Sequence, residues 1–162
     1  MSVQRVGFGF DLHKIECSET EQEVFLCGVP FKSKYKVIAH SDGDIGLHAI
    51  IEALLGALAL GNIGVLFPNT DPKYKGISSS LLLKEVFHKI KEIGAQIVNI
   101  DVTLICERPK IMSRSYELRQ NVANILELDV SKVSVKATTS EGVGIIGRQE
   151  AILAQAICMV LI

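Results

Sequence analysis

The chain has 162 residues, of which 48% are hydrophobic and 22% are charged, as in folded proteins with a buried core. Its 17 basic and 18 acidic residues nearly cancel, and only 6% of the residues are aromatic. This composition argues against a nucleic-acid binder and against a protein that binds anionic membrane surfaces.

The hydrophobic pattern predicts strands and helices in an irregular order. Residues 3–13 are expected to form a strand, and residues 24–37 a hairpin that bends near Gly28 and Pro30. Apolar residues at helical spacing predict helices over 44–60, 79–93 and 115–126. Alternating residues predict strands over 97–105 and 133–138, and the apolar segment 150–162 is expected to be a strand buried on both faces.

This order favours an α+β fold, with a mixed β-sheet and helices packed on one face, as a single domain over residues 1–162. The other face of the sheet is apolar in places, which suggests a subunit interface. The four cysteines form no C-x-x-C pair. Reduced thiols, the lack of a secretory leader pattern and the lack of a long apolar stretch predict a cytoplasmic protein.

A metal site is suggested by Asp11 and His13 at the end of the first strand. Side chains two residues apart in a strand point to the same face, so this carboxylate and imidazole leave the sheet together. Leu12 is then expected to enter the core. Because a D-x-H pair is common, the pair by itself does not establish a site.

The third candidate ligand is His48, which lies beside the apolar stripe of the first helix. Asp44, His48 and Glu52 follow at intervals of four and form a polar row. Two imidazoles and a carboxylate suit zinc (Zn2+) and leave its fourth position open, as in catalytic sites. The alternative is that His48 is a surface residue with no ligand.

Two further segments are candidates for phosphate binding. Residues 40–44 lead into the first helix, whose N-terminus favours an anion; His40 and Ser41 are extra donors, and Ser41 or Asp42 is expected to cap the helix. Residues 136–142 combine hydroxyl groups with Glu141, a carboxylate that suits magnesium. Residues 40–44 are equally compatible with a plain capping segment, and a run such as 136–142 is by itself often just a turn. The loops 67–72 and 108–110 could bind a ligand or merely connect elements.

An ordered set of motifs runs along essentially the whole chain: D-L-H at 11–13, A-H-S-D-G-D at 39–44 with L-H at 47–48, L-F-P-N-T-D-P at 66–72, R-P-K at 108–110, V-K-A-T-T-S-E at 135–141 and G-R at 147–148. Together they resemble the 2-C-methyl-D-erythritol 2,4-cyclodiphosphate synthase family. The resemblance implies a lyase of the non-mevalonate isoprenoid pathway. It would cyclise 4-diphosphocytidyl-2-C-methyl-D-erythritol 2-phosphate and release CMP.

The resemblance also implies roles for individual residues. Asp11, His13 and His48 would hold zinc, and Glu141 would hold magnesium or manganese (Mg2+ or Mn2+). His40 and Thr139 would stabilise charge in the transition state. The residues implied to contact the substrate are Ser41, Asn62, Ile63, Gly64, Phe67, Pro68, Asn69, Thr70, Asp71, Cys106, Pro109, Lys110, Ile111, Met112, Thr138, Ser140, Ile145 and Arg148, with the cytidine received by residues 106–112, 138 and 139.

Family members are homotrimers, so the resemblance further implies active sites between subunits and sheets that face the trimer axis. Arg148 would face an apolar central channel that can take a prenyl diphosphate. Four positions depart from the family pattern: Asn62 and Asn69 replace aspartates, Ser140 replaces a threonine and Ile145 replaces a phenylalanine. The asparagines remove charge where contacts to the methylerythritol hydroxyls are expected.

Two other functions compete with this interpretation. A zinc-dependent phosphohydrolase would use water as the nucleophile and release inorganic phosphate. A trimeric isoprenoid-binding protein with a structural metal would bind prenyl diphosphate without catalysis. The ordered motif set favours the cyclising synthase over both.

Overall fold

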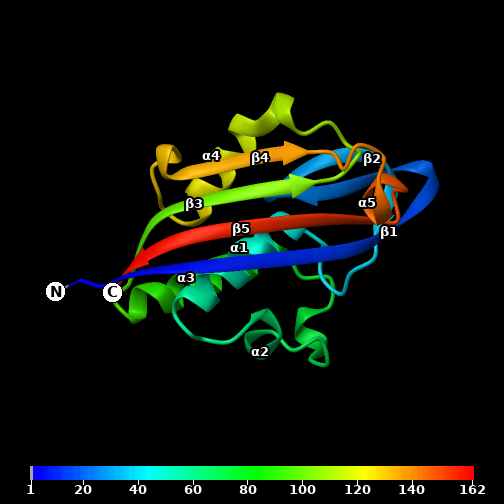
Figure 1. The fold of residues 1–162 in the computed structure, drawn as a ribbon. Coiled ribbons are helices and arrows are strands. Elements are labelled where there is room, and N and C mark those ends of the chain that lie inside the picture. The colour runs from blue at the N-terminus through cyan, green and yellow to red at the C-terminus, as the bar shows by residue number, and fades with distance from the viewer. Residues whose placement is uncertain (1) are drawn as a thin grey trace.

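The computed structural model describes residues 2–162, which build a five-stranded mixed sheet with the main helices against one face (Figure 1). The strands are β1 (Gln4–Leu26), β2 (Val29–Val37), β3 (Gln96–Ile105), β4 (Val133–Thr138) and β5 (Ala151–Leu161). Their order across the sheet is β2-β1-β5-β3-β4, and only β3 and β4 run parallel. The expected α+β architecture is confirmed.

Three longer helices confirm the helical periods read from the sequence. They are α1 (Ile45–Ala57), α3 (Ser79–Glu92) and α4 (Ser115–Ile125). The shorter helical elements are α2 (Ile63–Leu66), α5 (Gly144–Gly147) and the 3-10 turns η1 (Pro72–Tyr74), η2 (Met112–Arg114) and η3 (Val130–Lys132). Among residues 2–162, no helix combines the length and the apolar character that crossing a bilayer requires.

The first strand is longer than expected. β1 continues for 23 residues and pairs with β2 from Ile15 to Leu26, with one irregularity between Cys17 and Gln22. The middle of β1 is mostly exposed, so it carries no apolar alternation, and backbone pairing with β2 holds it extended. The hairpin bend falls at Cys27 and Gly28, both at positive φ, as the glycine there indicated.

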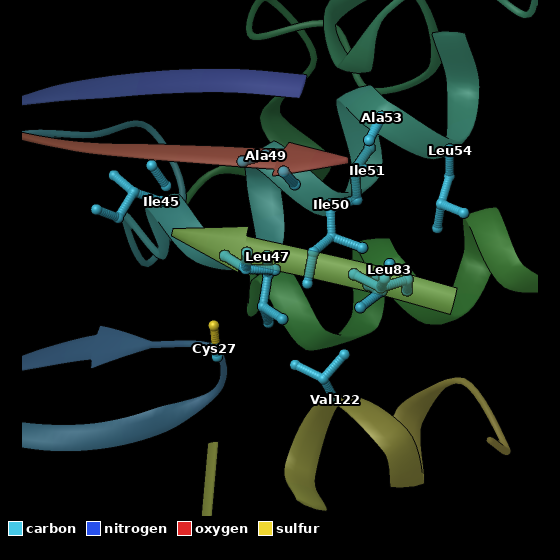
Figure 2. Packing of buried hydrophobic residues seen from close by; sticks show 14 of the residues in the cluster. Cys27, Ile45, Leu47, Ala49, Ile50, Ile51, Ala53, Leu54, Leu83 and Val122 are labelled. Carbon is cyan, nitrogen blue, oxygen red and sulfur yellow. The ribbon is translucent and has the colours of Figure 1, made fainter. Parts of the chain in front are cut away.

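Helix α1 is the centre of the core. All but two of its 13 residues are buried, between the sheet on one side and α3 and α4 on the other (Figure 2). Leu47 and Ile50 project toward Leu83 of α3 and Val122 of α4 in this view. A helix that is apolar on nearly every side belongs inside a domain rather than on its surface.

The backbone of α1 lies directly on β1, and two glycines permit it. A Cβ atom on Gly7 would lie 1.8 Å from the carbonyl oxygen of Ala53, and one on Gly9 would lie 1.9 Å from that of Ala49. Any side chain at these two positions would therefore push the helix away from the strand.

The opposite face of the sheet is open in the single chain. On this face Phe8 is 59% exposed and Ile157 is 49% exposed. The expectation that β5 is buried on both faces is thus wrong for one chain, because the helices cover only one face. The expectation for Leu12 is also wrong: it is 37% exposed on the open face, because Asp11 and His13 occupy the side toward α1.

We expect Gly9→Ala to lower the free energy of unfolding by about 1–3 kcal/mol or more, because the added methyl group overlaps the Ala49 carbonyl oxygen. The control is Gly56→Ala on α1, where the new Cβ meets its nearest atom at 3.8 Å. That change should stabilise the protein by about 0.5–1 kcal/mol through helix propensity. Denaturant unfolding measures both; equal stability of the two variants contradicts the close contact.

Candidate functional site

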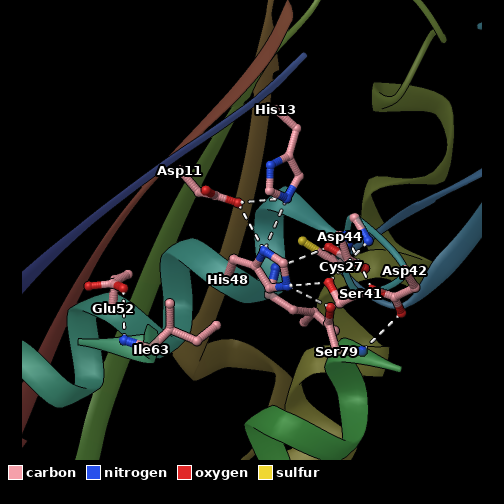
Figure 3. A network of polar contacts seen from close by, with 12 residues as sticks. Asp11, His13, Cys27, Ser41, Asp42, Asp44, His48, Glu52, Ile63 and Ser79 are labelled. Atoms are coloured by element: carbon pink, nitrogen blue, oxygen red, sulfur yellow. Dashed lines mark hydrogen bonds and ion pairs between the residues drawn. The ribbon is translucent and has the colours of Figure 1, made fainter. Parts of the chain in front are cut away.

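Asp11 and His13 of β1 meet His48 of α1 at one point (Figure 3). His48 Nδ1 lies 3.0 Å from Asp11 Oδ2, His13 Nε2 lies 3.2 Å from His48 Nδ1, and His13 Nε2 lies 3.3 Å from Asp11 Oδ2. Three ligand atoms from two distant segments thus form a small triangle, as expected from the sequence.

The size of this triangle fits a divalent cation. In a tetrahedral zinc site with bonds of roughly 2.0–2.1 Å, neighbouring ligand atoms are about 3.3–3.4 Å apart. The three measured separations lie close to that edge length. The triad also borders a cavity of about 370 Å³, so the fourth coordination position can face a ligand.

The charges around the triad also favour a cation. Burial lowers the pKa of His13, although the nearby Asp11 charge opposes this. Burial would lower the pKa of His48 too, but its hydrogen bond to Asp11 and the Asp11, Asp44 and Asp42 charges outweigh burial and raise it. Positive charge is therefore stabilised at His48, where a metal ion would compete with a proton.

Asp44 fixes the start of α1 and is itself fully buried. Its carboxylate accepts hydrogen bonds from the backbone N–H groups of Leu47 at 3.0 Å, Cys27 at 2.8 Å and Gly28 at 2.5 Å. Burial raises the pKa of Asp44 to about 6, although these three hydrogen bonds act to lower it. The expectation that Ser41 or Asp42 caps α1 is wrong, because Asp44 is the cap residue and its side chain accepts from the Leu47 N–H in the first turn.

The expected polar row on α1 is confirmed, and each member binds a different segment. Asp44 holds the β1–β2 turn, His48 belongs to the triad, and the Glu52 carboxylate accepts from the backbone N–H of Ile63 at 2.9 Å. The last contact attaches α2 to α1. It positions the part of the cavity wall formed by residues 63 and 64.

The cavity beside the triad is lined by His40, which was expected to be catalytic, and by six of the expected substrate contacts: Ser41, Ile63, Gly64, Phe67, Pro68 and Asn69. Four apolar or aromatic residues of the wall, Ala39, Tyr74, Ile77 and Leu82, were not predicted as site residues. Leu82 is 3% exposed and belongs to the core through the apolar side of α3. Spacing alone did not show that this core residue also borders a cavity.

Three other expected contacts do not line this cavity. Asn62 caps α2 by accepting from the Val65 N–H at 3.0 Å, and Asp71 caps η1 by accepting from the Lys73 N–H at 2.9 Å. Thr70 lies between these elements, outside the cavity lining. The two caps hold the loop that carries Phe67 to Asn69, so they shape the wall even without touching a ligand.

A second cavity, of about 290 Å³, collects the residues expected to receive cytidine: Cys106, Pro109, Lys110, Ile111, Met112, Thr138 and Thr139. The lining also includes Ser113 and Ala137, which were not predicted, and Glu107 of the expected 106–112 loop. Its carboxylate accepts from the N–H and hydroxyl of Ser140 and from the Gly142 N–H, and these bonds lower its pKa. Glu107 therefore ties the 106–112 loop to the segment after β4.

The two cavities belong to separated parts of the sheet. β4 lies three strands from β1, a distance of about 14 Å at the usual strand spacing. Glu141, which follows β4 and accepts from the Thr139 hydroxyl at 3.1 Å, is not part of the cation-binding triad. Ile145 and Arg148 follow along the chain toward β5, and Arg148 pairs with Glu150. The expected metal ligands thus fall into two groups.

Comparisons with known proteins agree on one family. The YgbB family matches residues 4–161. A 2-C-methyl-D-erythritol 2,4-cyclodiphosphate synthase from Ehrlichia canis is 45% identical over 158 residues, covering 96% of this chain and 91% of that protein.

Solved structures with this fold agree with the sequence match. An IspF from Plasmodium falciparum in complex with CDP matches with a TM-score of 0.85 and 34% identity, covering 98% of this chain and 96% of that chain. The bifunctional IspDF of Campylobacter jejuni matches with a TM-score of 0.93 and 36% identity. There the match covers 99% of this chain and 43% of that longer chain.

We expect the purified protein to hold one divalent metal ion per chain and Asp11→Ala to lose it, because two imidazoles alone bind zinc far more weakly than a full triad. Elemental analysis after dialysis measures the content. The control is Glu127→Gln, which removes an exposed carboxylate paired with Lys91. Equal metal content in Asp11→Ala and wild type would contradict the proposed metal centre.

Asp44→Ala should lower the free energy of unfolding by roughly 3–5 kcal/mol, because it removes a helix cap and leaves buried N–H groups without acceptors. Asp129→Ala provides the comparison, since Asp129 caps only the exposed η3 turn. That variant should lose about 0.5–1 kcal/mol. Urea unfolding of both tests the prediction, and similar losses would contradict the anchoring role of Asp44.

Proposed function

The chain belongs to the YgbB family, and on that premise we propose that it converts 4-diphosphocytidyl-2-C-methyl-D-erythritol 2-phosphate to 2-C-methyl-D-erythritol 2,4-cyclodiphosphate and releases CMP. The names of its full-length relatives support this reaction. The observation that carries the proposal is the Asp11-His13-His48 triad at the edge of a cavity. The reaction is a step of the non-mevalonate isoprenoid pathway.

The chemistry needs little from the protein besides positioning and charge. The substrate's 2-phosphate is already an anion, so it attacks the β-phosphorus without a strong general base. A new P–O bond closes the ring while the bond from the β-phosphorus to the CMP oxygen breaks. In phosphoryl transfer, aligned reactants and neutralised charge supply most of the rate enhancement.

The residues around the first cavity fit these tasks. His40 and Ser41 lie on its wall beside the triad, where they can donate hydrogen bonds to phosphate oxygens. Phe67, Pro68 and Leu82 form apolar wall that excludes water from the reacting groups. A divalent cation held by the triad would add positive charge at a diphosphate oxygen.

We assign the triad to zinc, because two imidazoles and one carboxylate form a donor set typical of zinc with an open position. Glu141 would hold magnesium or manganese, because a hard cation prefers carboxylate and phosphate oxygens. Thr139, whose hydroxyl lies 3.1 Å from the Glu141 carboxylate, would stabilise charge there. This second site would lie near the cytidine cavity.

A homotrimer would bring together the metal triad of one chain and the Glu141 segment of another. In one chain the triad and the Glu141 segment lie about three strand spacings apart, roughly 14 Å. An active site between subunits would bring the triad of one chain to residues 106–112 and 138–141 of the next. The exposed apolar face that includes Phe8 and Ile157 would turn toward the trimer axis.

Other assignments follow from the same proposal. In the trimer, the apolar sheet faces of the three chains would line a central channel for a prenyl diphosphate. Arg148 would face the diphosphate end of that ligand. Asn69 lines the first cavity and would meet a methylerythritol hydroxyl without the charge of an aspartate. We place this single-domain enzyme in the cytoplasm, where its four unpaired cysteines stay reduced.

Purified protein given the diphosphocytidyl substrate with zinc and magnesium should release CMP and the cyclic diphosphate in equal amounts. Liquid chromatography with mass detection measures both products. Release of inorganic phosphate without a cyclic product would contradict the proposal and show hydrolysis by water instead. Binding of the substrate without turnover would show that the protein is not this enzyme.

His40→Ala should lower kcat by about a hundredfold or more, because one well-placed donor to developing charge is commonly worth that much. The control is His88→Ala, which removes an exposed imidazole of α3 beside Phe87. Both variants should unfold at the temperature of the wild type. Near-normal turnover by the His40→Ala enzyme would show that His40 does not stabilise charge in the transition state.

A further inference from the structure

Behind His48, on the side away from the triad, lies a second set of polar contacts (Figure 3). The Ser79 hydroxyl of α3 lies 2.8 Å from His48 Nε2 and hydrogen-bonds to the Asp42 carboxylate. Ser79 has no exposed surface. The Ser41 hydroxyl also lies near His48 Nε2, at 3.2 Å.

The chemistry of these groups sets the direction of the hydrogen bonds. A carboxylate only accepts, so the Ser79 hydroxyl hydrogen points to Asp42. The lone pairs of that hydroxyl then accept a hydrogen from His48 Nε2. With its hydrogen on Nε2, the neutral imidazole of His48 has a free lone pair on Nδ1, the atom that faces Asp11 and His13.

We propose that Ser79 and Asp42 are positioning residues that hold His48 in the tautomer and ring orientation that bind the metal. This inference rests on the proposed metal site and deepens it. Metal-bound histidines commonly donate their other N–H to a partner that fixes the ring, and loss of such a partner weakens metal binding. Here the partner is a serine that is in turn oriented by a carboxylate.

The same carboxylate fastens α3. The cap residue Ser78 makes no side-chain hydrogen bond, and Asp42 accepts from the Ser79 N–H at 2.9 Å instead. It also accepts from the Asp44 N–H at 3.2 Å. The metal site is thereby linked to the seating of α3, whose Leu82 lines the first cavity.

A purely structural role for Ser79 predicts a different result. The backbone bond from the Ser79 N–H to Asp42 would by itself fasten α3, and it remains in Ser79→Ala. Only the hydroxyl that links Asp42 to His48 is lost. Ser78→Ala is the matched control, because it removes a neighbouring hydroxyl that makes no capping bond.

The test measures the zinc dissociation constant of wild type, Ser79→Ala and Ser78→Ala by competition with a chromophoric chelator. Ser79→Ala should bind zinc about 10–100-fold more weakly, while Ser78→Ala binds as the wild type does. Metal-free Ser79→Ala should unfold within about 2–4 °C of the wild type. Wild-type affinity in Ser79→Ala would overturn the inference and leave the metal site intact.

A double-mutant cycle separates positioning from general loosening. Because Asp42 acts on His48 through Ser79, the losses in zinc affinity from Ser79→Ala and Asp42→Asn should overlap, and the double variant should bind less weakly than the product of the two losses predicts. Fully multiplicative losses would refute the link. A wild-type protein that binds no zinc would refute the proposed metal site and this inference together.

Discussion

The close contact between α1 and the glycines of β1 is the constraint on which the site depends. Gly7 and Gly9 leave no side chain between the strand and the helix carbonyl groups of Ala53 and Ala49. Helix and strand therefore approach closely enough for His48 to meet ligands that project from β1. A Cβ at either glycine would lengthen that gap, and atoms set 3.0 to 3.3 Å apart would move out of coordination range.

The polar row on α1 shows how a buried helix carries function without losing stability. Asp44, His48 and Glu52 sit on an otherwise apolar helix, where an unpaired polar group would be costly. Each one instead forms a hydrogen bond with a segment distant in sequence: Asp44 accepts from the β1–β2 turn, His48 pairs with the Ser79 hydroxyl, and Glu52 accepts from the start of α2. These hydrogen bonds thus join the β1–β2 turn, α2 and α3 to α1.

The single chain presents two separated sets of chemical groups and one uncovered apolar face. The triad faces the helix layer. The second cavity lies where β3 and β4 end, and β4 is the edge strand of the sheet. Exposed side chains such as Phe8 leave apolar surface in water, which folding of one chain does not remove. An assembly of several chains would remove this apolar face from water and could place the triad of one chain beside the second cavity of another.

Sequence patterns alone predicted the three longer helices, the shared face of Asp11 and His13, and the family through its ordered motifs. They did not determine that Leu12 points to the open face, that Asp44 rather than a neighbour caps α1, or that Ser79 stands behind the metal ligand. Periodicity reports which side chains share a face, because it follows from local backbone geometry. Which face the helices cover, and which distant donor reaches a buried carboxylate, depend on how the elements pack, and only the tertiary structure decided that.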